Sequence, residues 1–294
     1  MAEKIRREWL GGLERSCRAD LESRIIPAPP LPGFDRIEAR FNGNFFEPHR
    51  HDTYAIGVTL YGVQTFKYRG ANHYSQPGQI IVLHPDELHD GAAGTDDGLR
   101  YRMLYLEPSL VRLAMGDLCS SLPFIRRPVI EDDLLLVTLT AALETLDRDL
   151  EDIQATEIVA DVTDGLVRHS ERQTGHRQTI ARPRIWRARD FLHENCQRNI
   201  SSIELEQVSG LDRYSLARQF RSAFGTSPHR FLIMRRLEHA RQLMSQGTSL
   251  AETATTVGFA DQSHLSRHFK KAFGVTPGKW AEAAKVRKGS SLAF

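Results

Sequence analysis

Histidines occur at spacings that suit a binding site in two short segments of the first hundred residues. His49 and His51 lie in PHRHDTY, and His84 and His89 lie in LHPDELHDG. If PHRHDTY is a strand, both of its imidazoles point to the same side, because side chains alternate between the two faces of a sheet. A third imidazole from a neighbouring strand would complete either a set of nitrogen ligands for a metal ion or a polar pocket for a small molecule.

These two segments resemble the two sequence motifs of cupin barrels. That resemblance implies a metal-binding glutamate a few residues after His-x-His, where this chain has Ala55 and Ile56. We therefore expect no metal ion, and instead a mostly apolar pocket with a few polar anchors for a small-molecule effector. The alternative is that the histidines only hydrogen-bond loops at the rim of the barrel. The candidate effector-binding residues are His49, His51, Tyr54, His84, His89 and Arg102.

A basic segment that occurs twice near the end of the chain indicates a second kind of chemistry. LDRYSLARQFRSAFGTSPHRF starts at Leu211, and ADQSHLSRHFKKAFGVTPGKW runs from Ala260 to Trp280. An offset of 49 residues pairs Asp212 with Asp261 and aligns the segments. In both copies apolar residues recur every four positions, so they share one helix face and leave the basic residues on the other.

Each copy is preceded by the signals of another helix. Ser201-x-x-Glu204 and Ser249-x-x-Glu252 are capping boxes, and a glycine that can end the helix follows each of them. Both units therefore predict a helix-turn-helix, in which the second helix enters the DNA major groove. The expected DNA-contacting residues are Arg213, Tyr214, Ala217, Arg218 and Arg221 in the first copy and Gln262, Ser263, His264, Arg267 and Lys271 in the second.

Spacing and charge both favour double-stranded DNA as the partner. The stretch SPHRFLIMRRLEHARQLM between the units predicts a helix that spans about 27 Å. Recognition helices held near that distance fit two successive major grooves, about 34 Å apart. From Ile180 to the end there are 19 Lys+Arg and 9 Asp+Glu, a net charge of +10, whereas the preceding 179 residues carry −8. Arg can contact guanine and Gln can contact adenine, while the other basic residues suit phosphates.

The front of the chain predicts an antiparallel β domain. Residues 34–106 alternate between apolar and polar, with turn signals at Arg69-Gly70, Pro77-Gly78 and between Gly91 and Gly98. Strands at this spacing predict a small barrel or jelly roll, and Pro27 to Pro30 predicts an extended arm before it. The fold class is α+β in two domains: a cupin-like antiparallel barrel with linker helices, then an all-α domain. We divide the chain into an arm and barrel (1–108), a helical linker and dimerisation segment (109–175) and a DNA-binding domain (176–294).

The segment between the domains predicts a helix that pairs two chains. EDDLLLVTLTAALETLDRDLED has leucines three and four positions apart, the spacing of a coiled-coil seam. We expect a homodimer through this seam, which consists of Leu136, Leu139, Leu143, Leu146 and Leu150. The alternative is that the helix packs on its own barrel. Glu171 to Arg182 is polar and without periodicity, which predicts the interdomain linker.

The tandem units resemble the DNA-binding domain of the arabinose-regulator (AraC/XylS-type) transcription factors, from about Arg184 to Lys285. The closing signature, GFADQSHLSRHFKKAFGVTPGKW, is highly specific. The resemblance implies a seven-helix domain with a rigid connecting helix, a cupin-like ligand-binding domain before it, an activator rather than a repressor, and RNA polymerase as a further partner. The chain departs from the family at Glu206, where a small residue is usual. Since a buried glutamate is costly unless it is paired, we expect the first subdomain to pack a little differently.

We interpret the chain as a sequence-specific DNA-binding transcription regulator that a small effector in the barrel controls, with no catalytic residues and no cofactor. Its first ten residues lack an apolar signal core, and no stretch approaches the about eighteen apolar residues of a membrane span. Three cysteines far apart fit a reducing cytosol, so we expect a cytoplasmic protein. Two other classes stay open: a metal-dependent cupin dioxygenase or isomerase with a basic appendage, and a binder of RNA or of a membrane surface.

Overall fold

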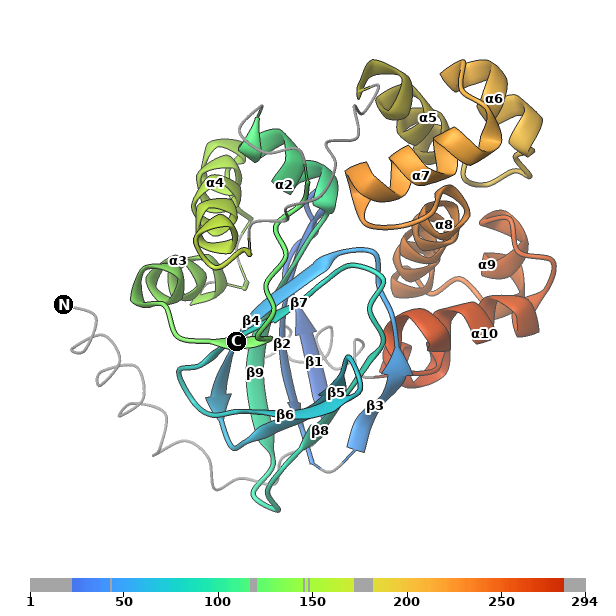
Figure 1. The fold of residues 1–294 in the computed structure, drawn as a ribbon. Helices are drawn as coiled ribbons and strands as arrows, with labels where there is room; N and C mark the ends of the chain where they lie inside the picture. The colour runs from blue at the N-terminus through green and yellow to red at the C-terminus, as the bar shows by residue number, and fades with distance from the viewer. Residues whose placement is uncertain are drawn as a thin grey trace.

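The computed structural model describes residues 23–42, 44–116, 121–144, 146–147, 149–171 and 182–282. Within them an antiparallel β domain with accompanying helices is followed by an all-helical domain, which confirms the expected fold class (Figure 1). The strands are β1 (Arg24–Pro27), β2 (Phe34–Phe41), β3 (Asn44–His49), β4 (Tyr54–Tyr61), β5 (Gln64–Tyr68), β6 (Ala71–Ser75), β7 (Ile80–Leu83), β8 (His89–Ala93), β9 (Leu99–Leu106) and β10 (Val129–Ile130). The helices are α2 (Pro108–Met115), α3 (Asp133–Glu144), α4 (Asp152–Arg168), α5 (Arg182–Glu194), α6 (Ser202–Ser209), α7 (Arg213–Phe224), α8 (Pro228–Ser245), α9 (Leu250–Thr256) and α10 (Gln262–Phe273).

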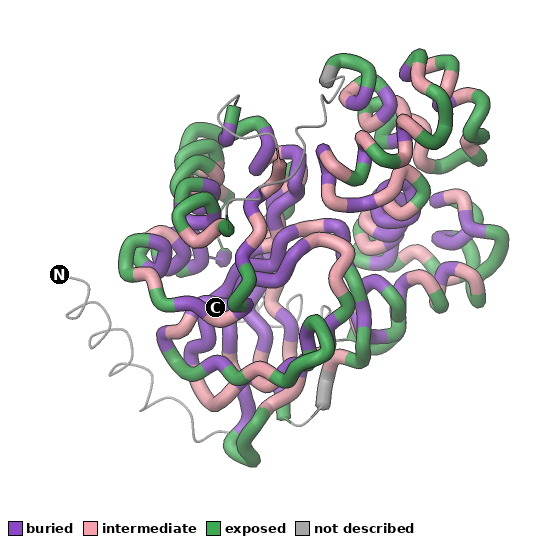
Figure 2. The backbone as a smooth tube through the Cα atoms, in the orientation of Figure 1, coloured by how far each residue is buried: buried purple, intermediate pink, exposed green. Residues whose placement is uncertain are grey.

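The strands form two antiparallel sheets. One sheet has the order β1-β2-β9-β4-β7-β10, and the other has the order β3-β8-β5-β6. Apolar side chains from both sheets, among them Phe41, Phe66 and Met103, are buried in one cluster. The tube in Figure 2 shows how much of the strand backbone belongs to buried residues. Apolar side chains of the two sheets thus pack together in the described part of the barrel.

Several strands differ from the periodicity-based prediction. β3 pairs with β8 through register shifts on both sides of Phe46, which breaks the simple alternation in sequence. Pro27, which the sequence placed in an arm, closes the edge strand β1 and pairs with Ile37. An edge strand tolerates proline, because a residue without N–H loses no ladder hydrogen bond on its open side.

The leucine-rich segment packs inside its own domain. α3 ends at Glu144, so the expected long helix stops there and Leu146 lies in a turn. Four of the five seam leucines, Leu136, Leu139, Leu143 and Leu146, are buried, and the fifth, Leu150, packs against the same apolar cluster. That cluster also contains Leu104 of β9 and Val162 of α4. The predicted coiled-coil seam is thus wrong for these side chains. Spacings of three and four suit any helix with one apolar face, including one packed on a sheet.

The second domain contains the same pair of helices twice, as the repeat predicted: α6 with α7, and α9 with α10. Asp212 and Asp261 cap α7 and α10 by accepting backbone N–H groups of the first turn. Gly225 and Gly274 end these helices in the left-handed conformation, with φ of 69° and 71°. At α6 the Ser201 capping box is complete, whereas at α9 only the serine half of the box is formed. None of the described helices is long and apolar enough to cross a membrane.

The helical domain lies against the barrel (Figure 1). Ile37 and Met103 of the barrel belong to the same continuous cluster of buried apolar residues as Met234 of α8 and Phe269 of α10. The first helix-turn-helix unit has a cluster of its own, which includes Phe220 and Phe224. The second unit is therefore the one that shares a core with the barrel. Most of the expected linker, residues 172–181, lies outside the described residues.

Candidate functional site

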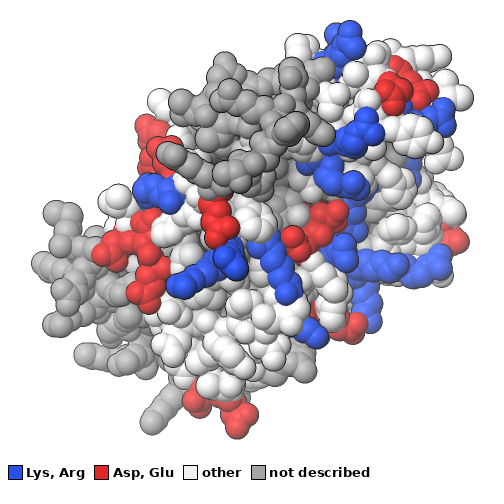
Figure 3. All heavy atoms as spheres, viewed as in Figure 1, with Lys and Arg blue, Asp and Glu red and all other residues white. Residues whose placement is uncertain are grey.

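The recognition helices α7 and α10 present most of the expected DNA-contacting residues to solvent. Leu216 and Phe220 of α7, like Leu265 and Phe269 of α10, are buried, so the opposite faces point outward. Figure 3 shows Lys and Arg gathered over the C-terminal helices on the right of the view. The exposed members are Arg213, Tyr214, Arg218, Arg221, Gln262, Ser263, Arg267 and Lys271, while Ala217 and His264 are half-buried. Contact of these side chains with DNA stays a prediction.

Three of these side chains, those of Arg213, Arg218 and His264, already have partners on the protein, and Arg218 donates to the Ser215 hydroxyl at 3.2 Å. The Nε of Arg213 lies 2.9 Å from Oε1 of Glu206, which also accepts the backbone N–H of Arg213 at 2.8 Å. Glu206 is thus paired and partly exposed, not buried as its position in the family pattern suggested. His264 turns toward His268, and their Nε2 atoms are 3.0 Å apart.

The C-terminal ends of both recognition helices touch the N-terminal half of the chain. Lys271 of α10 accepts the backbone N–H of Arg50 at 3.0 Å, and Gly274 accepts that of Glu47 at 3.2 Å. The carboxylate of Glu47 also pairs with Lys270 at 2.8 Å. At α7, Arg112 of α2 donates to the carbonyl oxygen of Ser222 at 3.1 Å. The barrel thus contacts α10, and helix α2 contacts α7, behind the surface that would face DNA.

A buried ionic group joins the domains beside these contacts. Arg235 of α8 pairs with Glu107, with Asp52 at 3.0 Å and with Glu238 at 2.9 Å. Burial alone would raise the pKa of Glu107, but Arg235 and Arg189 hold it below its usual value. Burial raises the pKa of Asp52, against the opposing effect of Arg235. No residue pattern pointed to this group, because Arg235 belongs to a basic helix and becomes buried only when the domains meet.

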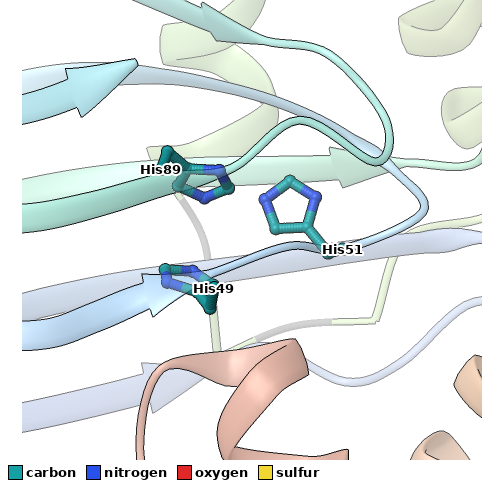
Figure 4. Close-up of side chains that lie close together, drawn as sticks. All are labelled: His49, His51 and His89. Carbon is teal, nitrogen blue, oxygen red and sulfur yellow. The ribbon is translucent and has the colours of Figure 1, made fainter. Parts of the chain in front are cut away.

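Three of the histidines singled out in the sequence converge (Figure 4). His49 ends β3, His51 follows it, and His89 opens β8 opposite His49. One potential ligand nitrogen from each ring lies within 4.8 Å of the other two. Ring centroids are 4.3 Å apart for His49 and His89, and 4.7 Å for His51 and His89. The expectation that His-x-His and a histidine from a neighbouring strand would meet is confirmed.

Burial keeps these three rings in the neutral form. It lowers the pKa of His49 to about 3 and that of His89 to about 4, and the pKa of His51 lies well below its usual value. The neighbouring imidazoles add to the effect on His49 and His51, because a charge on one ring disfavours a charge on the next. Neutral imidazole is the form that ligates a metal ion or accepts a hydrogen bond.

The other candidate effector residues lie apart from this cluster. Tyr54 donates its hydroxyl hydrogen to the carbonyl oxygen of Pro123 at 2.8 Å. His84 contacts the Tyr68 hydroxyl at 2.8 Å through Nδ1 and accepts the N–H of Ile125 at Nε2. Arg102 pairs with the buried carboxylate of Glu38, as Arg100 also does. These three side chains hold the β domain together and are not brought to the histidine cluster.

A cavity of about 80 Å³ lies between the two domains next to the histidines. A site for one water molecule needs roughly 10–15 Å³ by the same measure, so the space suits a few waters or a small molecule. Its wall combines apolar surface with a few charged groups. The barrel contributes Ile25, Ile37, His49, His51, Asp52 and Tyr105, and the helical domain contributes Met234, Glu238, Arg241, Phe273 and Trp280.

Two family models match the chain in the same order as its domains. Residues 31–162 match the AraC-like ligand binding domain, and residues 205–283 match a helix-turn-helix domain. An uncharacterised HTH-type transcriptional regulator of Bacillus subtilis, YbfI, is 26% identical over 236 residues, which cover 78% of this chain and 86% of that protein. The HTH-type transcriptional activator RhaS of Yersinia pseudotuberculosis is 26% identical over 242 residues, 78% of this chain and 87% of its own.

Solved structures show the same overall fold. ToxT from Vibrio cholerae aligns over 86% of this chain and 99% of its own, with a TM-score of 0.62 and 14% identity. Another ToxT structure, bound to (E)-4-(8-methylnaphthalen-1-yl)but-3-enoic acid, aligns over 85% of this chain and 99% of its own, with a TM-score of 0.61 and 15% identity. With both family models in this order and exposed recognition helices in place, the chain belongs to the AraC-type transcriptional regulators, with a ligand-binding domain followed by a helix-turn-helix DNA-binding domain.

Proposed function

We propose that this regulator binds a specific duplex sequence through α7 and α10, and that a small effector in the interdomain cavity controls how these helices are held. The observation that carries the proposal is the position of the cavity. His49 and Tyr105 of the ligand-binding domain line one side of it, and Phe273 of α10 and Trp280 line the other. A molecule in this space contacts both domains at once.

The exposed faces of the recognition helices support DNA contact. Arg267 and Gln262 stand on the outer face of α10, and these residue types form bidentate hydrogen bonds to guanine and adenine. Arg218, Arg221 and Lys271 add positive charge that suits phosphate oxygens. Phosphate contacts release counterions, so binding weakens steeply as the salt concentration rises.

The contacts behind the helices supply a route from the effector to the DNA. α10 ends on Glu47 and Arg50, which flank His49 at the cavity. An effector that binds more tightly to one arrangement of these contacts increases the population of that arrangement. The size of the shift is set by the difference between its affinities for the two arrangements. Because the coupling is reciprocal, bound operator DNA changes the affinity for the effector by the same factor.

We further propose that the protein acts in the cytoplasm as an activator and not as an enzyme, that it pairs with a second chain, and that it contacts RNA polymerase. The relative RhaS is named a transcriptional activator, which supports activation rather than repression. Leu134 and Val137 of α3 and Ile153 and Val167 of α4 are exposed apolar side chains, which supports pairing through this face.

Selection of genomic fragments with the purified full chain tests the DNA-binding proposal. The bound duplexes are sequenced after selection at a low and a moderate salt concentration. We expect a shared motif with two blocks about one helical turn apart, one for each recognition helix. Salt-sensitive binding without any shared motif would mean that α7 and α10 contact only phosphates, and would reject sequence-specific recognition.

A further inference from the structure

We propose that His49, His51 and His89 form a binding site for one divalent transition-metal ion of the kind that imidazole holds, such as Zn²⁺ or Fe²⁺. The three rings come from two adjacent strands and the residue that follows one of them, and they point toward one another (Figure 4). One nitrogen from each lies within 4.8 Å of the other two, the range in which a single ion can bind them all. All three side chains are buried.

The hydrogen bonds of the rings determine which nitrogen of each ring carries the proton and which is free to act as a ligand. The Nδ1 atoms of His49, His51 and His89 lie 2.8, 2.9 and 3.0 Å from backbone carbonyl oxygens of Glu47, Thr53 and Glu87. A carbonyl oxygen only accepts, so Nδ1 carries the hydrogen and Nε2 carries the lone pair. In metal-bound histidines, too, the ring nitrogen that does not bind the metal commonly donates its N–H to a carbonyl or carboxylate oxygen. This hydrogen bond orients the ring and makes the metal-binding nitrogen more basic.

A hydrogen-bonding role alone does not account for this arrangement. The Nε2 of His51 is buried and has no hydrogen-bond partner among the described residues. A buried polar atom without a partner costs about 1–3 kcal/mol. Lone pairs that converge without a donor between them repel one another, and a cation removes both penalties. If the rings only formed hydrogen bonds to loops, their convergence would have no stabilising effect.

Three imidazoles without a carboxylate are a sufficient set of protein ligands. Zinc sites with an open position use three protein ligands, and three histidines are one of the known sets. The missing glutamate, on which the expectation of no metal rested, is therefore not required. The remaining position has room on the cavity side, because His49 and His51 both line the cavity between the domains.

The site lies directly behind the second recognition helix. Glu47 and Arg50, on either side of His49 in the chain, donate their backbone N–H groups to Gly274 and Lys271. An ion that joins β3 to β8 would fix the strand on which the C-terminal end of α10 rests. Metal binding itself requires neither DNA nor an effector, so it can be tested without assuming the regulatory proposal.

The test is a titration of the full chain, without a histidine tag and after treatment with a chelator, with Co²⁺ as the spectroscopic probe. We expect one Co²⁺ per chain with visible absorption bands of a low-coordinate ion, displaced by one equivalent of Zn²⁺. Zn²⁺ should also raise the unfolding temperature, because an ion that binds only the folded chain stabilises it. This second readout needs no substitution.

Variants assign the bound ion to the cluster. His51→Gln and His89→Gln should each abolish stoichiometric Co²⁺ binding, with circular dichroism to verify that the chain is folded. His73→Gln is the matched control, because His73 belongs to β6 of the same barrel and its ring stacks on Phe66 at 5.4 Å. Absence of stoichiometric binding in the unmodified chain, or binding that survives in both folded cluster variants, overturns the proposal.

Discussion

Gly274 ends the second recognition helix in contact with His49 of the barrel. A Cβ atom on Gly274 would lie 2.8 Å from Nδ1 of His49 and 2.9 Å from the carbonyl oxygen of Glu47. Gly225 at the end of α7 is in the same situation, because a Cβ atom added to it would lie 2.9 Å from the Cβ of Pro85. Both recognition helices thus end on the ligand-binding domain at a glycine, and the two domains approach each other at these glycines too closely for a side chain.

Gly274→Ala is expected to weaken the contact between the domains. The left-handed backbone at this position costs alanine about 1–2 kcal/mol. Overlap with His49 and Glu47 adds roughly 1–3 kcal/mol, as overpacking does elsewhere. Chemical unfolding measures the total loss, and small-angle X-ray scattering should show a larger radius of gyration as the domains separate.

Gly210→Ala is the matched control for this substitution. Gly210 also has a positive φ, of 66°, but an added Cβ meets no described atom within 4 Å. It should lose stability through strain alone and keep the radius of gyration of the unmodified chain. Equal effects of Gly210→Ala and Gly274→Ala would show that the contact with His49 contributes nothing.

Arg235→Met should also separate the domains, for an electrostatic reason. Methionine retains much of the apolar stem but leaves Asp52 and Glu107 without their shared partner in a buried place. Removal of one partner from a buried ion pair typically costs about 3–5 kcal/mol. The unfolding temperature and the radius of gyration report the change. Arg187→Met on the exposed face of α5 is the control, and a variant of Arg235 as stable as this control would contradict the argument.

Glu206→Ala is expected to strengthen binding to DNA of any sequence. The substitution removes a negative charge from the recognition surface and releases Arg213 from its 2.9 Å ion pair. One additional phosphate contact should steepen the plot of log K against log salt by about 0.9. Fluorescence anisotropy at several salt concentrations measures this slope. The gain should vanish when Arg213→Ala is added, and Glu194→Ala, an equal charge change in α5, should not reproduce it.

Arg267→Ala should weaken binding to the selected site by roughly 1–3 kcal/mol if the side chain contacts a base. Its exposed position on the outer face of α10 leaves it available for that contact. Binding to a random duplex should change far less. An equal loss on both duplexes would instead make Arg267 a phosphate contact. Lys67→Ala, an exposed cation on the barrel, controls for the loss of one positive charge.

Leucine substitutions distinguish the buried leucines of α3 from the exposed ones. Leu139 is fully buried, so Leu139→Asp should unfold the β domain rather than yield folded single chains. Leu134 is 70% exposed, and Leu134→Asp should leave the fold intact. If two chains pair through the α3 and α4 surface, Leu134→Asp halves the mass measured by light scattering. An unchanged dimer mass would exclude that surface.

Both recognition helices can be predicted from the residue order alone. Caps at Asp212 and Asp261 and glycine stops at Gly225 and Gly274 act within a few residues, so the repeat predicts where α7 and α10 begin and end. The His-x-His spacing also predicted that a third histidine could join His49 and His51, but β3 ends at His49, and only its pairing with the distant strand β8 brings His89 to them. The helix boundaries depend mainly on interactions between residues that are close to one another in the chain.

The surfaces that these local elements face depend on how the domains pack. Leu139 has the same spacing whether its helix meets a second chain or its own sheet, and only the position of β9 and α4 makes it a core residue. Arg102 was a candidate effector ligand, but the structure pairs it with Glu38, and Arg235 becomes buried between Asp52 and Glu107 only because the two domains meet. Contacts between distant segments depend on how whole domains pack, and no residue pattern within one segment encodes that.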